Sequence, residues 1–91
     1  MAEKAVVAKK KKTDVAIIYN GRTKEFTRKP DETVGTLLAK AIERFEVTSE
    51  PHRLSLFDAE GREIPDTETL KQAKVKAGDE LVLRQSTVKG G

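Results

Sequence analysis

The chain has 91 residues, enough for one small domain with a single modest core, and its apolar and charged fractions are both 36%. No apolar run is long enough to span a bilayer and no signal-peptide core lies near residue 1, so we expect a cytoplasmic protein without a membrane partner. The formal net charge is only +3, and the absence of cysteine excludes disulfides, thiolate metal sites and a cysteine nucleophile.

The excess positive charge is concentrated at the N-terminus. Residues 1–13 hold five of the 18 basic residues and one of the 15 acidic residues, so residues 14–91 hold 13 basic and 14 acidic residues. A nearly neutral domain lacks the basic surface of a nucleic-acid-binding protein, and we expect no nucleic-acid partner. Because like charges repel, we predict a disordered arm over 1–13. The arm contains the lysine run Lys9, Lys10, Lys11 and Lys12. The run has three possible roles: it supplies acceptor lysines, it binds anions, or it only improves solubility.

A β-hairpin is predicted at the start of the folded part. Residues 14–20 are mostly β-branched or apolar, and they end at Asn20-Gly21. This pair favours a two-residue hairpin turn, because both turn positions need a positive φ. A second strand follows over about 22–28 and is stopped by Pro30, which cannot donate a hydrogen bond to a sheet.

The clearest helical pattern follows this hairpin. Asp31 or Thr33 is suited to cap it, and acidic side chains stabilise a helix N-terminus. Gly35 costs about 1 kcal/mol relative to alanine inside a helix, and we attribute it to a close approach to a strand. The apolar residues at helical spacing are Val34, Leu37, Leu38, Ala41, Ile42 and Phe45.

Three further strands are predicted, over 53–57, 62–64 and 80–85. Between the last two, a polar segment over 66–77 carries spaced apolar anchors and a single predicted helical turn at about 67–71. A hairpin, one long helix and two or three more strands indicate an α+β domain. The anchors are Leu70, Ala73 and Val75.

Residues 85–91 form a polar tail without an apolar pattern. It ends in Gly90-Gly91, and glycine without a Cβ allows a chain to enter a narrow channel. Seven extended residues span roughly 24 Å at about 3.3–3.6 Å each. The alternative is an ordinary frayed terminus.

The chain resembles ubiquitin and its β-grasp relatives over about residues 14–91. The stretch 52–57 is similar to the third strand of ubiquitin, 61–64 to the turn and short strand that follow, and 81–84 with Gly90-Gly91 to its last strand and reactive tail. The resemblance implies a mixed sheet of four or five strands packed on one main helix, in the order ββαβ(β)β. It divides the chain into an arm (1–13), a ubiquitin-like domain (14–84) and a flexible tail (85–91).

Two positions depart from ubiquitin. Ser55 stands where ubiquitin has an exposed isoleucine at the centre of its partner-binding patch, and Arg84 stands at a second patch position. Proteins that recognise ubiquitin through this apolar patch are therefore not expected to bind this chain. The lysine-bearing extension resembles the leader of SUMO-type modifiers, and the hairpin and the divergent body favour a prokaryotic-type protein.

The resemblance implies a protein modifier. In this superfamily an activating enzyme with bound ATP and magnesium adenylates the terminal glycine, a conjugating-enzyme cysteine takes the acyl group as a thioester, and a target lysine forms an isopeptide bond. An isopeptidase of the JAB/JAMM or cysteine type removes the modifier. Gly91 would be the acyl donor beside Gly90, with Lys89, Val88 and Arg84 as the partner-binding tail. The chain itself would be a monomer that binds no cofactor and has no catalytic residue.

Alternatives remain beside the modifier. A sulfur carrier would convert the same adenylate to a thiocarboxylate, and a β-grasp binding module would never be activated. An enzyme is not expected, because the only histidine, His52, lies in a loop without a nucleophile or an orienting carboxylate. Asp58, Glu60 and Glu63 surround a turn and are predicted to be solvated rather than to bind a metal.

Overall fold

The computed structural model describes residues 14–89. The predicted arm with its four consecutive lysines, and the predicted acyl donor Gly90-Gly91, lie outside the described residues.

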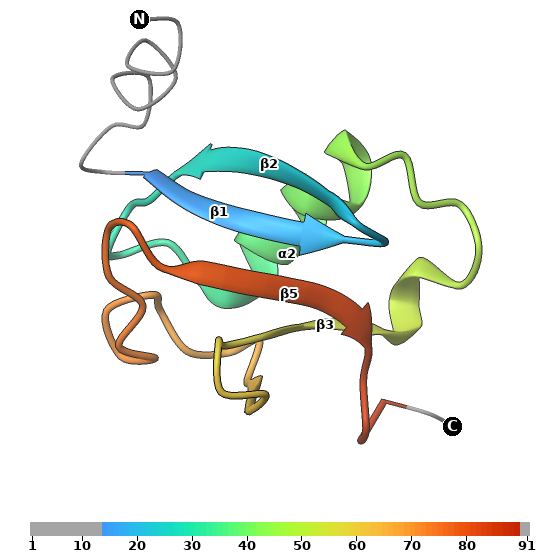
Figure 1. Ribbon diagram of the computed structural model, residues 1–91. Coiled ribbons are helices and arrows are strands. Elements are labelled where there is room, and N and C mark those ends of the chain that lie inside the picture. The colour runs from blue at the N-terminus through green and yellow to red at the C-terminus, as the bar shows by residue number, and fades with distance from the viewer. Residues whose placement is uncertain (1–13, 90–91) are drawn as a thin grey trace, which may run out of the picture.

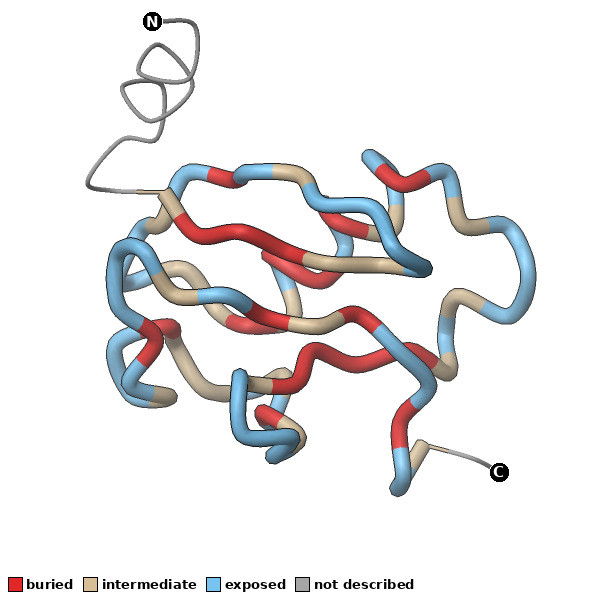
Figure 2. Tube along the Cα trace, in the orientation of Figure 1, coloured by how far each residue is buried: buried red, intermediate tan, exposed pale blue. Residues whose placement is uncertain are grey.

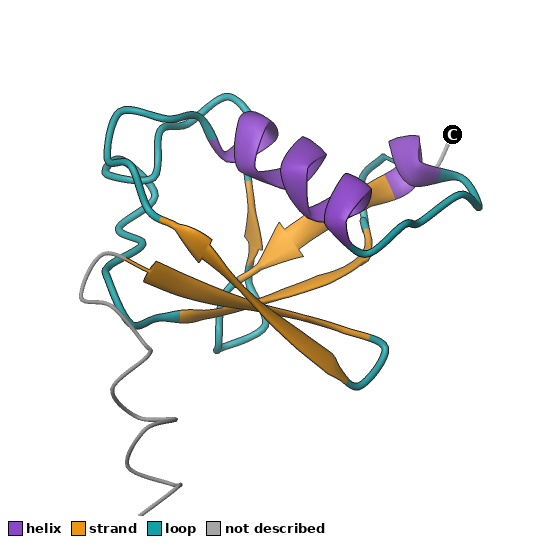
Figure 3. Ribbon diagram, turned by 90° about the horizontal axis from the view of Figure 1, so that it is seen from above, coloured by secondary structure: helices purple, strands orange, loops and turns teal. Residues whose placement is uncertain are grey.

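The described residues form one five-stranded mixed sheet with a helix on one face (Figures 1 and 3). Strand order is β2-β1-β5-β3-β4; β1 runs parallel to β5, and the other neighbouring strands are antiparallel. This arrangement confirms the predicted α+β fold of the ubiquitin-like β-grasp type. The elements in chain order are β1 (Asp14–Tyr19), β2 (Arg22–Thr27), α2 (Val34–Arg44), the 3₁₀ turn η1 (Pro51–Arg53), β3 (Leu54–Phe57), β4 (Glu63–Ile64) and β5 (Glu80–Gln85).

The hairpin turn forms where the sequence predicts it. Asn20 and Gly21 have φ values of 54° and 82°, and Tyr19 pairs with Arg22 across the two-residue turn. Both angles lie in the left-handed region that the Asn-Gly pair tolerates best. The turn therefore sets the register of β1 against β2.

Helix α2 begins at a threonine cap. The Thr33 Oγ1 accepts a hydrogen bond from the Thr36 backbone N–H at 3.2 Å, which selects Thr33 over Asp31 as the cap. Gly35 does lie in a close contact, but with a loop instead of a strand. A Cβ at Gly35 would be 3.3 Å from the Asp66 carbonyl oxygen, which also accepts the Gly35 N–H at 2.9 Å.

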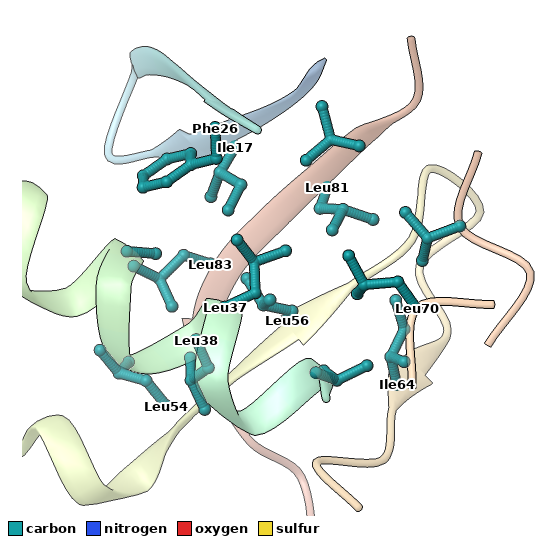
Figure 4. Close-up of a cluster of buried hydrophobic side chains, with 14 of the residues drawn as sticks. Ile17, Phe26, Leu37, Leu38, Leu54, Leu56, Ile64, Leu70, Leu81 and Leu83 are labelled. Carbon is teal, nitrogen blue, oxygen red and sulfur yellow. The ribbon is translucent and has the colours of Figure 1, made fainter. Parts of the chain in front are cut away.

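One hydrophobic core lies between α2 and the sheet. Figure 4 shows that side chains of α2 point toward those of the sheet strands. The buried residues in Figure 2 lie along the same helix and strands. The predicted helix face is buried, except that Ile42 is only partly covered. The labelled core residues are Ile17, Phe26, Leu37, Leu38, Leu54, Leu56, Ile64, Leu70, Leu81 and Leu83.

The segment after β4 differs from its prediction. It forms successive turns instead of a helical turn over 67–71, because its backbone bonds to the loop before α2: Leu70 donates its N–H to the Glu32 carbonyl, and Lys71 to the Pro30 carbonyl. The anchors nevertheless lie inside, since Leu70 and Val75 are buried. This segment places Asp66 beside both the N-terminal end of α2 and Lys89.

Candidate functional site

The last described residues remain attached to the domain. Strand β5 extends to Gln85, which pairs with Leu54, and the Ser86 N–H then donates to the Arg53 carbonyl at 2.8 Å. Ser86 is only 8% exposed. The sequence predicts a flexible tail from residue 85, but the structure shows 85–89 bonded to strands and loops. The reason is that backbone pairing with β3 continues two residues past Leu83, the last apolar residue of β5, and that the residues after it form hydrogen bonds of their own.

Glu63 on β4 accepts three hydrogen bonds from this segment. They come from the Ser86 Oγ, from the Thr87 N–H at 3.0 Å and from the Thr87 Oγ1 at 2.7 Å. Burial disfavours the charged carboxylate, but the hydrogen bonds from Ser86 and Thr87 outweigh it and lower the pKa of Glu63 from its ordinary 4.5 to about 2. Glu63 is therefore an ionised acceptor at neutral pH.

Ser86 also folds the chain beyond it. Its Oγ accepts the backbone N–H groups of Val88 and Lys89, both at 2.9 Å, which turns the chain sharply below β5 (Figure 1). Such local bonds to serine stabilise turns. At this turn Val88 is 80% exposed, and it is the one large exposed hydrophobic residue among those described.

Lys89 completes the attachment. Its Nζ donates to the Leu54 carbonyl at 2.8 Å and contacts the Asp66 Oδ2 at 2.6 Å. Both charged side chains are about one-third exposed or less, so this ion pair is only partly screened by solvent. We call the two carboxylates, Glu63 and Asp66, together with the segment Ser86–Lys89, the tail clasp.

The sheet face opposite α2 contains the two positions that depart from ubiquitin. Ser55 pairs with Arg84 across β3 and β5, so these predicted positions do lie side by side. The Arg84 guanidinium lies 4.3 Å from the centre of the Phe57 ring, and Ser55 is only 1% exposed. A partner approaching this face therefore meets a cation over an aromatic ring and no exposed apolar residue at position 55.

The other candidate residues have local roles. His52 is exposed in η1. Asp58 accepts the backbone N–H groups of Glu60 and Arg62 and pairs with the Arg62 side chain; the backbone bond from Arg62 contributes most to lowering the pKa of Asp58. Over residues 14–89, no group of three His, Asp or Glu side chains is arranged to hold a metal ion. Within the same range, no helix has the length and apolar character needed to cross a bilayer.

Sequence reasoning did not find the clasp partners. Val88 and Lys89 were predicted as tail residues, and Glu63 was assigned to a solvated turn, whereas Asp66 was not singled out. Glu63 lies 23 and 24 residues before Ser86 and Thr87, and Asp66 lies 23 residues before Lys89. No spacing rule joins positions so far apart, and only the return of β5 between β1 and β3 brings them together.

Solved ubiquitin-like structures resemble this fold. The ubiquitin of Caldiarchaeum subterraneum is 32% identical with a TM-score of 0.70, and the match covers 87% of this chain and 98% of that one. A de novo designed protein based on ubiquitin is 29% identical with a TM-score of 0.71, covering 86% and 93%. ATBAG1, solved in complex with HSP70, is 18% identical with a TM-score of 0.70, covering 84% and 41%, and shows the shared fold alone.

Family membership follows from these matches and from a family model. No curated protein sequence matches the chain. A family model matches residues 8–91, almost the whole chain. The chain is thus a ubiquitin-like protein and belongs to the family described as "Protein of Unknown function (DUF2604)".

Proposed function

We propose that this ubiquitin-like protein is a modifier joined to target lysines through Gly91. The observation that carries the proposal is a ubiquitin-like domain, 32% identical to an archaeal ubiquitin over 98% of its length, whose last strand is followed within six residues by Gly-Gly. Gly90 and Gly91 have no side chains to obstruct a narrow channel.

The proposed chemistry takes place on partner enzymes. A carboxylate is a poor electrophile, so an activating enzyme first joins the Gly91 carboxylate to AMP and releases pyrophosphate from ATP, with magnesium bound to the nucleotide. A cysteine thiolate displaces AMP to form a thioester, and a lysine amine displaces the thiolate to form the isopeptide bond. In this scheme the chain is a substrate and a label instead of an enzyme, and the use of ATP is consistent with a cytoplasmic location.

Three described residues at or near the tail have proposed roles in partner recognition. Val88 offers an exposed apolar side chain, Lys89 a positive charge and Arg84 a cation on the adjacent sheet face. Because position 55 is a buried serine, the partners are expected to differ from those that bind the apolar patch of ubiquitin. Lys9 to Lys12 stay candidates for acceptor lysines, and an isopeptidase would reverse the conjugation.

Peptide mass spectrometry of the native host tests the proposal. Trypsin cuts after Lys89, so each conjugate leaves Gly-Gly on a modified lysine. The comparison is between the native chain, a chain without Gly91 and a chain with Glu60→Gln, which changes a carboxylate away from the tail. We expect Gly-Gly-bearing lysines in the first and third, and their loss in the second.

Other results would assign other functions. A terminal thiocarboxylate in the intact mass, without modified lysines, would identify a sulfur carrier and refute the modifier. An unmodified terminus and no modified lysines would leave a protein-binding module. Deletion of Gly91 would then have no effect on the partners that the chain captures.

A further inference from the structure

The tail clasp limits how far the C-terminal residues can reach. Measured from the end of β5 at Gln85, the six remaining residues could extend roughly 21 Å at about 3.5 Å each. With Ser86–Lys89 bonded to the domain, the reach beyond Lys89 is that of Gly90 and Gly91, and two residues span roughly 7 Å. A closed clasp therefore shortens the usable tail about threefold.

The bonds of the clasp join the tail to two different parts of the domain. Glu63 on β4 binds Ser86 and Thr87, whereas Asp66 in the following loop binds Lys89. Both acceptors are carboxylates, and charge-assisted hydrogen bonds are roughly twice as strong as neutral ones. Their positions depend on the core and on α2, because the Asp66 carbonyl accepts the Gly35 N–H. The acceptors are therefore bonded to other elements of the fold, Glu63 through the pairing of β4 with β3 and Asp66 through α2.

We propose that Glu63 and Asp66 are positioning residues that keep the tail closed on the domain, and that a partner must open the clasp to reach Gly91. The purpose of opening the clasp rests on the proposed function. The closed state does not, because it is a property of the free chain. An enzyme that binds only the extended tail selects the open population, so its apparent affinity falls in proportion to that population. The clasp thus favours partners that supply acceptors for Ser86, Thr87 and Lys89.

Trypsin measures the closed state without any partner. Cleavage after Lys89 requires an extended backbone and insertion of the Lys89 ammonium into the protease pocket, and the clasp engages both. When opening is fast compared with cleavage, the cleavage rate reports the population of the open form. We would follow the loss of Gly90-Gly91 from the folded full-length chain by mass spectrometry, beside a synthetic peptide of residues 83–91.

The variants separate the clasp from general stability. Glu63→Gln is isosteric and removes the charge, Asp66→Asn does the same at the second acceptor, and Glu60→Gln is the matched control, because no side-chain contact links it to the tail. We expect cleavage after Lys89 in the native chain to be at least about tenfold slower than in the peptide. Glu63→Gln should accelerate it about tenfold, because Glu63 accepts through both carboxylate oxygens and the glutamine keeps only one. Asp66→Asn should accelerate it only about threefold, because Lys89 contacts a single oxygen of Asp66, which the asparagine keeps.

Cleavage after Lys24, inside β2, reports global unfolding in the same samples. Glu63→Gln is expected to accelerate that cut as well, because it also lowers the free energy of unfolding. Thr87→Val then decides, since it removes the Thr87 hydroxyl donor and changes no core residue; its rate is compared with a peptide carrying the same change. Equal rates for the native chain and the peptide would overturn the proposal, as would protection that none of these variants reduces. Neither result depends on whether Gly-Gly-modified lysines exist.

Discussion

Glu63→Gln is expected to lower the free energy of unfolding in a pH-dependent way. The substitution keeps the size of the side chain but replaces an ionised acceptor of three hydrogen bonds with a neutral amide. The amide nitrogen cannot accept a hydrogen bond, so either the Ser86 hydroxyl, or both the N–H and the hydroxyl of Thr87, lose their partner. The change therefore acts directly on the clasp and leaves the core intact.

The magnitude follows from the pKa of Glu63. A change from the ordinary 4.5 to about 2 corresponds to at most about 3.4 kcal/mol at about 1.36 kcal/mol per pKa unit. Glu63 is partly exposed, so solvent screening reduces this value, and we expect about 1–2 kcal/mol at pH 7. This range agrees with the tenfold change in tail opening, which is about 1.4 kcal/mol.

The direction of the pH dependence is determined by the lowered pKa. Above pH 4.5 the carboxylate is ionised in both the folded and the unfolded chain, and its stabilising contribution is fully present. Between about 4.5 and about 2 the unfolded chain takes up the proton first, so the contribution is lost as the pH falls. The difference between native chain and variant should thus shrink toward zero near pH 2.

Urea unfolding followed by far-ultraviolet circular dichroism is the suitable assay, because the chain has no tryptophan and a single tyrosine. Curves at pH 7, 4, 3 and 2 would be compared for the native chain, Glu63→Gln and Glu60→Gln. The other carboxylates titrate in all three proteins, so their contributions cancel when the free energies of unfolding of the native chain and a variant are subtracted. The role of the ionised carboxylate would be refuted if Glu63→Gln did not change the free energy of unfolding at pH 7, or changed it equally at every pH.

Further substitutions test the core, the sheet face and the tail. Phe45→Ala should cost about 3–5 kcal/mol in urea unfolding, because the side chain is 4% exposed in the core; a near-neutral result would contradict its packing. Ser55→Ile, which introduces the ubiquitin residue, should cost about 1–3 kcal/mol, since the site is 1% exposed and the larger side chain must displace the groups that cover it. Helix propensity alone would make Gly35→Ala more stable by about 1 kcal/mol. We expect no such gain in the free energy of unfolding, because the new Cβ would lie 3.3 Å from the Asp66 carbonyl oxygen; a stabilised variant would show that the loop at Asp66 moves freely. Val88→Asp should leave stability within about 0.5 kcal/mol but reduce the number of Gly-Gly-modified lysines, and unchanged conjugation would exclude a role in recognition.

Local signals in the sequence determined most of the secondary structure. The Asn-Gly pair placed the hairpin turn, and the helical spacing of apolar residues placed α2, because turn conformation and amphipathicity depend on residues only a few positions apart. The conformation of the polar segment after β4 was not predicted by these local signals. Its backbone bonds to the loop before α2, and a bond to a distant carbonyl leaves no periodic trace in the sequence.

The tertiary structure alone decided the candidate site. The sequence identified Val88, Lys89 and the glycines as tail residues, and the resemblance to ubiquitin placed Ser55 and Arg84 on one face. That Glu63 and Asp66 bind the tail depends on the pairing of β5 with β3, which in turn pairs with β4, and β5 lies far from both in the chain. The local sequence around a carboxylate in a turn is the same whether the carboxylate faces water or accepts three hydrogen bonds. Only the packing of the strands distinguishes the two.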